Sequence, residues 1–412
     1  MNPEPPQQRS RAREILAMLA IFSVLRYLLA QNTSITWERM GLTGRQYEWL
    51  PSAWNVGYTL FQVPAGNWAD RRGPRFVLAL CAASWTLLTV LVSIVPDFFI
   101  QGSLAWLISL ILLRFVLGIT MAGTYPVSAR MVTKWFSATT RTRATAAVLV
   151  GAPVGIAIAM PLVATVMSGF GWRATFYVTG LLPIPILLWW WLRSSNGLGQ
   201  NINPETGKAS LTVALSFLRN RNILLLCIAY LFNETVLSAL INWAFSYIDQ
   251  VWGKGTVTTG WIASIPFLVA VIAMLATGHA IDRSRLRLDA VQVRRFIAIT
   301  CAILSAAGLL IVARAPNVLI AIIFLSCSVG AQFGSENSYW SMAIDMSKEE
   351  VGTATGLLNF FGSIGFIAGN ILVAALKPSD GGGGGWETVF ISAATCAAAA
   401  CLLWLPIRPA IR

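Results

Sequence analysis

Long apolar runs, each about as long as a helix that crosses a bilayer, follow one another through most of this 412-residue chain. About 20 predominantly apolar residues in a helix span the hydrocarbon core of a membrane. Only 11% of the residues are charged, against about 25% in soluble domains, so a polar surface could not cover these runs. The chain is therefore predicted to be an all-α polytopic membrane protein embedded in a lipid bilayer. Twelve spans are expected: 15–33, 47–66, 76–96, 104–129, 144–166, 172–192, 222–248, 257–281, 296–313, 317–342, 352–376 and 387–407.

Basic residues are unevenly distributed between the two sides of these spans. If the N-terminus is inside, 22 Lys and Arg fall in cytoplasmic segments and six fall outside. This bias is the positive-inside pattern, and it predicts an even number of spans with both termini in the cytoplasm. Topology thus accounts for the net charge of +13, and nucleic acid is not expected as a partner.

The longest polar connection divides the spans six and six. It predicts a cytoplasmic linker at 193–221 between two six-helix halves, at 15–192 and 222–407. Short cytoplasmic tails are expected at 1–14 and 408–412.

The two halves also repeat short motifs at corresponding places. Gly66-x-x-x-Asp70-Arg71 after the second span recurs after the eighth as Gly278-x-x-x-Asp282-Arg283. A Gly-Trp pair likewise opens both the sixth and the twelfth span. Repeated six-span halves are typical of one transporter architecture, with a substrate site expected between the halves.

Motifs for covalent chemistry are missing. The six cysteines lie inside apolar runs without CxxC or Cys/His spacing, which predicts neither disulfides nor a metal site. The sequence has no phosphate-binding glycine loop, nucleophile elbow or HExxH motif, so we expect neither an enzyme nor a cofactor.

The stretch 57–75, GYTLFQVPAGNWADRRGPR, resembles the second span and following loop of the major facilitator superfamily. The match extends over nearly the whole chain and is nearest to the anion:cation symporter branch, which includes galactonate, hexuronate and phthalate permeases. Other segments similar to this branch are Arg114-Phe115-Val116-Leu117-Gly118, Tyr125-Pro126, Leu218-Arg219-Asn220-Arg221, Trp340 and Gly356-Leu357-Leu358-Asn359. The resemblance implies twelve helices in two pseudo-symmetric six-helix halves, in a monomer of the bacterial inner membrane.

The loop after the second span also has a physical interpretation. A small Gly66 allows close helix approach, and Asp70 with Arg71 and Arg75 can form a charge cluster that breaks when the cytoplasmic side opens. We expect these residues, with Asp282 and Arg283 of the repeat, to act as a gate. A purely topological role for the basic loop is the alternative.

Four charged residues fall well inside the expected spans: Arg26, Arg114, Glu234 and Glu336. Charges at such depth are costly, and they are functional candidates that should face the interior of the bundle. The resemblance implies an anion-coordinating role for Arg114. Because the four charges sum to zero, two internal ion pairs that only hold helices together are the alternative.

Two positions depart from the family pattern. Where the family carries Tyr, one residue and then Asp-Arg in the first span, this chain has Tyr27 followed by Leu28, Leu29 and Ala30. The family acid seven residues after Arg114 is replaced by Met121. Arg26 lies one helical turn before Ala30 and could supply the missing cation. Any proton coupling is therefore expected at Glu234 or Glu336, with Glu336 favoured.

The expected function is secondary transport of a small organic anion, such as a sugar acid or an aromatic acid, by alternating access, with possible proton coupling. Export of a hydrophobic or cationic compound is the alternative, as is a uniporter or exchanger without proton coupling. An arginine surrounded by amide and aromatic groups suits a carboxylate that carries hydroxyls or a ring. The expected substrate-binding residues are Arg26, Tyr27, Tyr58, Gln62, Arg114, Asn337, Trp340 and Asn359.

Overall fold

The computed structural model describes residues 6–136, 138–194, 217–284, 290–347, 351–377 and 385–407. Most of the expected linker at 193–221 and the whole tail at 408–412 lie outside these ranges. Every regular element in the described residues is helical, which confirms the predicted all-α class. Two compact units are formed, one drawn from residues 1–41 and 53–204 and the other from residues 42–52 and 205–412. We call them the N-terminal and the C-terminal unit.

Several spans of the N-terminal unit consist of two helices in succession. The break between α10 and α11 coincides with Pro183, which has no backbone N–H to continue the helix. The helices of this unit are α1 (Pro6–Ala30), α2 (Asn32–Thr36), α4 (Trp49–Arg72, which begins in the other unit), α5 (Pro74–Ile94), α6 (Leu104–Met121), α7 (Thr124–Trp135), α8 (Ala138–Leu149), α9 (Gly151–Phe170), α10 (Trp172–Leu181) and α11 (Pro183–Arg193).

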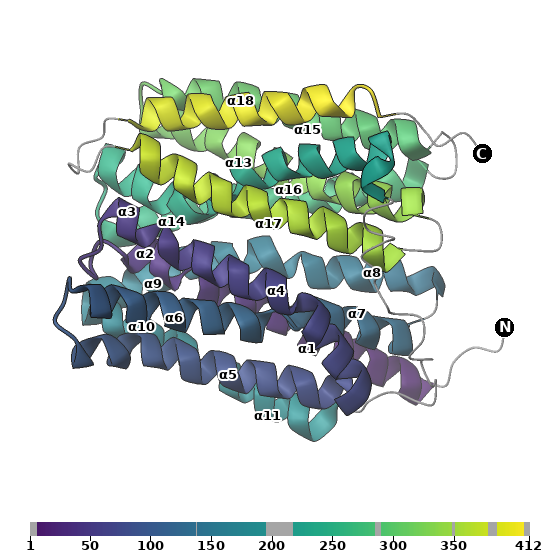
Figure 1. Cartoon of the computed structure of the whole chain (residues 1–412), viewed down its shortest axis with the longest axis horizontal. Helices are drawn as coiled ribbons and strands as arrows, with labels where there is room; N and C mark the ends of the chain where they lie inside the picture. The colour runs from purple at the N-terminus through teal and green to yellow at the C-terminus, as the bar shows by residue number, and fades with distance from the viewer. Residues whose placement is uncertain are drawn as a thin grey trace. The chain divides into compact units, whose positions relative to one another are not determined.

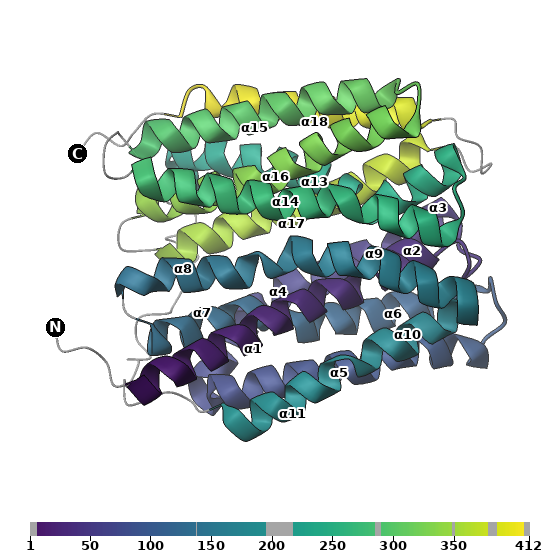
Figure 2. The ribbon, with the colours of Figure 1, turned by 180° about the vertical axis from the view of Figure 1, so that it is seen from behind.

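The spans of the C-terminal unit are continuous by contrast. Its helices are α3 (Gly44–Tyr47), α13 (Arg221–Trp252), α14 (Thr256–Ser284), α15 (Ala290–Ala313), α16 (Val318–Ser347), α17 (Val351–Leu376) and α18 (Trp386–Trp404). α15 and α18 run side by side in both views (Figures 1 and 2), and α13 packs against α17.

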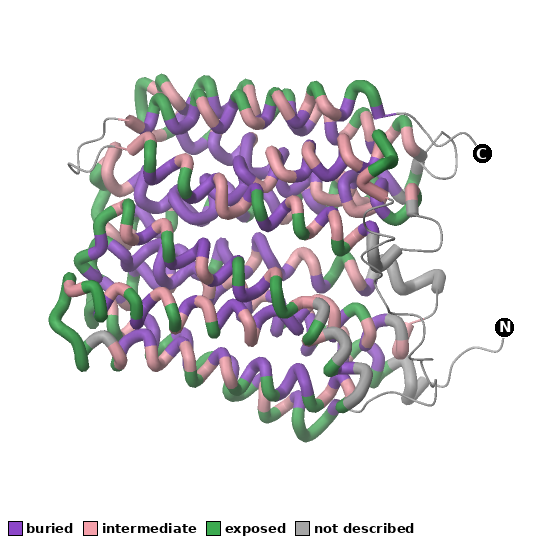
Figure 3. Tube along the Cα trace, in the orientation of Figure 1, coloured by how far each residue is buried: buried purple, intermediate pink, exposed green. Residues whose placement is uncertain are grey.

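Eleven helical segments in the described residues are long and apolar enough to cross a membrane. α4 covers the remaining expected span, at 47–66, from Trp49 onward. Large apolar side chains remain exposed along these helices, as at Leu87 (60%), Leu112 (56%) and Ile272 (68%). Figure 3 shows buried and exposed residues alternating along the helices, so that individual helices have an inner and an outer face. Exposed apolar surface of this kind fits contact with lipid, and the chain is a multi-pass membrane protein.

Candidate functional site

Arg26 lies on α1 and is surrounded by aromatic rings of its own unit. Its side chain is buried, with 2% of its surface exposed. A guanidinium over ring faces within about 6 Å is attracted by their quadrupoles. The guanidinium carbon lies 4.5 Å from the ring centroid of Tyr58, 4.6 Å from that of Tyr27, 5.0 Å from that of Tyr125 and 5.3 Å from that of Trp54. We call Arg26 and these four aromatic residues the Arg26 cage.

Glycines bring the helices of the cage together. A Cβ atom at Gly155 of α9 would lie 2.3 Å from the carbonyl oxygen of Val24 and 3.0 Å from the Cβ of Tyr27. A Cβ atom at Gly118 of α6 would lie 2.0 Å from the carbonyl oxygen of Trp54. Only glycine permits such approaches, so these positions hold α9 against α1 and α6 against α4.

The Arg26 guanidinium has no counter-ion among the described residues of its unit. None of the described residues accepts a hydrogen bond from Nε or Nη1, although both atoms are buried. No carboxylate among the described residues of the N-terminal unit forms an ion pair with Arg26. The rings stabilise the cation, but they leave its hydrogen-bond donors available for an anion.

Arg114 on α6 is also buried, with 3% of its surface exposed. Its Nη2 donates to the carbonyl oxygen of Ala30 at 3.1 Å. Ala30 is the last residue of α1, where the carbonyl end of a helix attracts a cation. Ala30 is also the position at which the family pattern has an arginine. In this chain Arg114 donates a hydrogen bond to the backbone at that position.

Met121 stands where the family pattern has an acid, and it completes the wall of the cage. The indole N–H of Trp54 lies 3.3 Å from the Met121 Sδ. Trp54 stacks on Tyr58 with centroids 5.3 Å apart and the two rings 6° from parallel. Gln62 follows Tyr58 by one turn of α4 and is half-buried. The replacement of a carboxyl by a thioether therefore leaves an apolar aromatic wall beside Arg26.

The C-terminal unit gathers donors around an acid instead of rings around a cation. Glu336 on α16 accepts hydrogen bonds at Oε2 from the Tyr230 hydroxyl at 2.9 Å and from the Trp340 indole N–H at 3.1 Å. Its Oε1 accepts from the Asn233 amide at 3.0 Å. With Glu234, these residues make up what we call the Glu336 cluster.

Glu234 follows Asn233 on α13 and is half-buried. Its carboxyl group is near that of Glu336, and both glutamates adjoin the Tyr230 side chain. A Cβ atom at Gly362 of α17 would lie 3.1 Å from the Glu234 Cγ and 2.5 Å from the Tyr230 ring. The absence of a side chain at Gly362 therefore provides the space that the Tyr230 and Glu234 side chains occupy.

The other expected binding residues of this unit are placed differently. Asn337 donates to the Met274 carbonyl oxygen at 2.8 Å and to the Thr277 hydroxyl at 3.0 Å, both on α14. Its amide therefore holds α16 to α14 instead of joining the Glu336 cluster. Asn359 is half-buried on α17.

The expected gate is only partly described. Gly66, Asp70, Arg71 and Asp282 belong to helices, but the surroundings of Gly66 and the side chains of the other three are not described. Arg75 donates to the Trp191 carbonyl oxygen and lies 5.0 Å from the centroid of its ring, so it ties α5 to α11. Arg283 is exposed.

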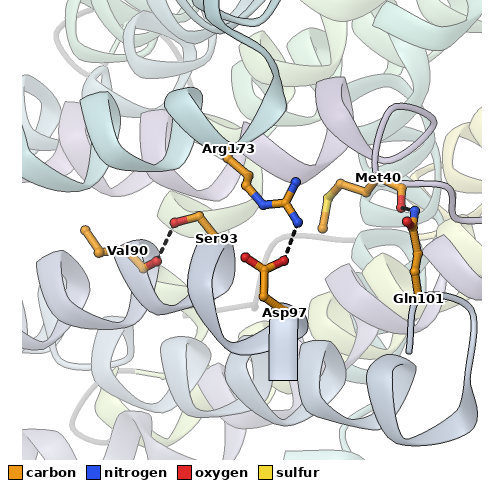
Figure 4. A network of polar contacts seen from close by, with 6 residues as sticks. All are labelled: Met40, Val90, Ser93, Asp97, Gln101 and Arg173. Atoms are coloured by element: carbon orange, nitrogen blue, oxygen red, sulfur yellow. Dashed lines mark hydrogen bonds and ion pairs between the residues drawn. The ribbon is translucent and has the colours of Figure 1, made fainter. Parts of the chain in front are cut away.

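An ion pair joins Asp97 to Arg173 in the N-terminal unit, beside bonds from Gln101 to the Met40 carbonyl (3.0 Å) and from Ser93 to the Val90 carbonyl (2.7 Å) (Figure 4). The C-terminal unit has its equivalent with the charges exchanged, since Arg314 pairs with Glu387 at 2.7 Å. Neither pair is predicted from the sequence. The signal in the sequence is the charged residue that follows each repeated Gly-Trp motif, Arg173 in one half and Glu387 in the other.

Tyr230 is also absent from the residues predicted from the sequence. It precedes Glu234 by four residues and therefore shares a helix face with it. That spacing is the signal in the sequence, because it places a hydroxyl donor beside an intramembrane acid; in the structure this hydroxyl donates to Glu336.

Known proteins resemble this chain over nearly its full length. The sequence profile described as Major Facilitator Superfamily matches residues 15–370. A probable L-galactonate transporter of Escherichia coli (strain K12) is 25% identical over 366 residues, which cover 82% of this chain and 79% of the relative. A hexuronate transporter of Bacillus subtilis (strain 168) is 24% identical over 393 residues, covering 89% of this chain and 88% of the relative.

Solved structures share the fold at lower identity. A bacterial homologue of the human lysosomal transporter Spinster, in an inward-facing and occupied conformation, superposes with a TM-score of 0.75 at 16% identity, covering 95% of this chain and 96% of the other. The nucleoside transporter NupG gives a TM-score of 0.68 at 14% identity, covering 95% of this chain and 98% of the other. These likenesses confirm the expected helical transporter fold.

Proposed function

This chain belongs to the major facilitator superfamily, and on that premise we propose that it is a secondary transporter of small organic anions that works by alternating access. In this proposal Arg26 and Arg114 bind the carboxylate of the substrate. The observation that carries the proposal is the Arg26 guanidinium, buried among four rings with Nε and Nη1 unbonded in the described residues.

Burial of a cation at this depth has a cost that a substrate anion can offset. Insertion scales put an arginine at the centre of a membrane helix at about 2.5–3.5 kcal/mol. A carboxylate that accepts from the free donors of Arg26 would form charge-assisted hydrogen bonds, and the planar guanidinium suits a two-point contact. An anion is thus the ligand that this geometry stabilises most.

The names of the relatives support the same substrate class. Among them are transporters named for L-galactonate, hexuronate and tartrate, all of them hydroxylated carboxylates. The rings of the Arg26 cage offer faces against which the carbon skeleton of an acid can pack, and the Tyr27, Tyr58 and Tyr125 hydroxyls offer hydrogen bonds. We propose a sugar acid or an aromatic acid as substrate.

The proposal includes coupling to protons and a location in the bacterial inner membrane with both termini in the cytoplasm. The excess of basic residues in the expected cytoplasmic segments supports that orientation. Glu234 and Glu336 are the proposed coupling residues.

Export of a cationic compound is a second candidate, and the Glu336 cluster favours it. Two carboxyl groups beside Tyr230 and Trp340 could bind a lipophilic cation through charge and ring faces. Such a substrate would need Glu336 more than it needs Arg26.

Uptake into proteoliposomes separates the two candidates. Galactonate, glucuronate, tartrate and benzoate would be compared with tetraphenylphosphonium for the wild type, Arg26→Ala and Arg314→Ala. Arg314 is the matched control, because its side chain is 78% exposed and pairs with Glu387. We expect transport of at least one acid, its loss in Arg26→Ala and its retention in Arg314→Ala. Transport of the cation alone, unaffected by Arg26→Ala, would reject the anion transporter.

A further inference from the structure

We propose that Glu234 and Glu336 hold one proton between them, with Glu234 the carboxylic acid that donates to the Glu336 carboxylate, and that this proton is the one that moves during transport. The transport part rests on the function proposed above, whereas the protonation state can be tested without it. The donors around Glu336 and the contact between the two carboxyl groups assign the proton to Glu234.

The environment of Glu336 is built for a carboxylate. An ionised carboxylate only accepts hydrogen bonds, and an indole N–H only donates them. Both oxygens of Glu336 accept, Oε2 from Trp340 and Tyr230 and Oε1 from Asn233. The amide of Asn233 is oriented in turn by Ser335, whose hydroxyl donates to Oδ1 at 3.0 Å. These donors stabilise the charged form of Glu336.

Glu234 has a different environment. The described groups that interact with it are the Glu336 carboxyl and the Tyr230 side chain. Two ionised carboxyls would repel each other and could not share a hydrogen bond, because neither would carry a hydrogen atom. Because no cation among the described residues pairs with either acid, one proton shared by the two carboxyls removes this repulsion. Since Glu336 is already surrounded by donors, that proton lies on Glu234.

The described residues of the surrounding helices supply no cation that would replace the proton. No Lys, Arg or His in the described part of the C-terminal unit forms an ion pair with Glu234 or Glu336. The titratable groups that interact with the pair are Tyr230 on α13, whose hydroxyl donates to Glu336, and Tyr339 on α16, whose hydroxyl donates to the Ala229 carbonyl oxygen. α17 contributes Gly362, which has no side chain. The proton is thus the available positive charge for two neighbouring acids.

The proton can also leave. Both glutamates are half-buried and so remain partly accessible. They lie on different helices, Glu234 on α13 and Glu336 on α16, so a change in the packing of these helices alters the bond that holds the proton. The sequence alone favours Glu336 as the coupling residue; the hydrogen bonds favour Glu234 as the carrier and Glu336 as its acceptor.

Infrared spectroscopy of the purified full-length protein at neutral pH tests the protonation state directly. A protonated carboxyl has a C=O stretch distinct from that of a carboxylate. We expect this band in the wild type, its loss in Glu234→Gln and its retention in Glu336→Gln, where Glu234 can still donate to the new amide oxygen. Glu387→Gln is the matched control, because that glutamate is half-exposed and paired with Arg314.

Two results would overturn the shared proton. One is a wild-type protein without the band, and the other is a band that persists in Glu234→Gln. Thermal unfolding checks that each variant is folded, and Glu234→Asp, which keeps the acid, should keep the band if Glu234→Gln proves unstable. Loss of the wild-type band on adding sodium chloride in place of choline chloride would also contradict the proposal, since sodium would then occupy the pair.

Transport assays test whether this proton is the coupled one. The side-chain amide that Glu234→Gln introduces keeps a donor toward Glu336 but cannot release a proton. This variant should therefore retain exchange of substrate across the membrane and lose accumulation driven by a pH gradient. Accumulation at the wild-type level would reject the coupling role. If the wild type transports no organic acid while the infrared result holds, the proposed function fails and the shared proton stands.

Discussion

The two units place opposite charges on corresponding helices of the six-span repeat. In the N-terminal unit the first span carries Arg26 and the fourth carries Arg114 and Tyr125, with rings around the cation and no carboxylate paired to it among the described residues. In the C-terminal unit the seventh span carries Tyr230 and Glu234 and the tenth carries Glu336, with donors around an acid. The difference teaches that one repeated framework can hold either sign of charge, according to whether it is lined with rings or with donors.

The signs of the charges are also exchanged in two ion pairs, each of which includes the residue after a repeated Gly-Trp motif. Asp97 pairs with Arg173 in the N-terminal unit, and Arg314 pairs with Glu387 in the C-terminal unit. Both motif glycines have positive φ, 82° at Gly171 and 90° at Gly385, a conformation open to glycine at little cost. The positive-φ glycine is thus repeated in both units, whereas the charges of the paired side chains are exchanged.

The largest expected effect comes from removing the second cation of the N-terminal unit. Arg114→Ala removes the Arg114 hydrogen bond to the Ala30 carbonyl and one of the two cations proposed to bind the substrate. We expect transport to fall by about 30-fold or more, as for the loss of about 2–5 kcal/mol at a buried charged contact. Transport in proteoliposomes, normalised to the amount of reconstituted protein, measures this. Arg114→Lys should recover only part, because a point charge cannot form the two-point contact. Wild-type transport by Arg114→Ala would reduce the residue to a packing role.

The next largest effect is expected at Gly118, where α6 approaches α4 closely beside the Arg26 cage. Gly118→Ala places a Cβ atom 2.0 Å from the Trp54 carbonyl oxygen, so α6 must move away from α4. We expect a loss of stability of about 1–3 kcal/mol, the usual cost of overpacking, visible as a lower midpoint of thermal unfolding. Gly356→Ala on α17 is the control, since its Cβ atom would meet no atom within 4 Å. Equal midpoints for the two variants would contradict the close approach.

A carboxyl placed in the cage would make the N-terminal unit resemble the C-terminal one. Met121→Glu introduces an acid beside Trp54, and we expect it to pair with Arg26 and to lower the affinity for a substrate anion about tenfold, as when a charged hydrogen bond is lost. Met121→Gln has the same shape without the charge and should lower the affinity much less. Calorimetric titration would compare the two, and equal affinities would argue against an anion site at Arg26.

The smallest effect is expected at the outer ion pair. Asp97→Asn should cost about 0–1 kcal/mol, because the side chains of Arg173 and Asp97 are 48% and 55% exposed. Exchanging both charges, Asp97→Arg with Arg173→Asp, reproduces the order found in the C-terminal unit and should restore the wild-type midpoint of unfolding. A double variant less stable than either single variant would show that the Asp97–Arg173 and Arg314–Glu387 sites are not equivalent.

The sequence predicts the helices well because bilayer thickness constrains their length. The expected span 172–192 corresponds to α10 and α11, which end at Arg193. The break at Pro183 inside that span is not visible in hydropathy, since it depends on a local hydrogen bond and leaves composition unchanged.

Intramembrane charges are equally easy to find, because their cost makes them rare. Their surroundings are harder to predict. Tyr230 lies 106 residues before Glu336, and only the packing of α13 against α16 brings them within 2.9 Å. Asn337 and Glu336 are neighbours in sequence, yet they face different helices because successive residues of a helix point about 100° apart.

Binding of a carboxylate to the purified protein tests the central claim most directly. An acid that the wild type transports would be titrated by calorimetry into the wild type and into Arg26→Gln, which keeps hydrogen-bond donors but no charge. If Arg26 is the cation that the substrate neutralises, the affinity should fall at least about tenfold, as for the loss of a charge-assisted hydrogen bond. An unchanged affinity in a folded Arg26→Gln protein would contradict the account.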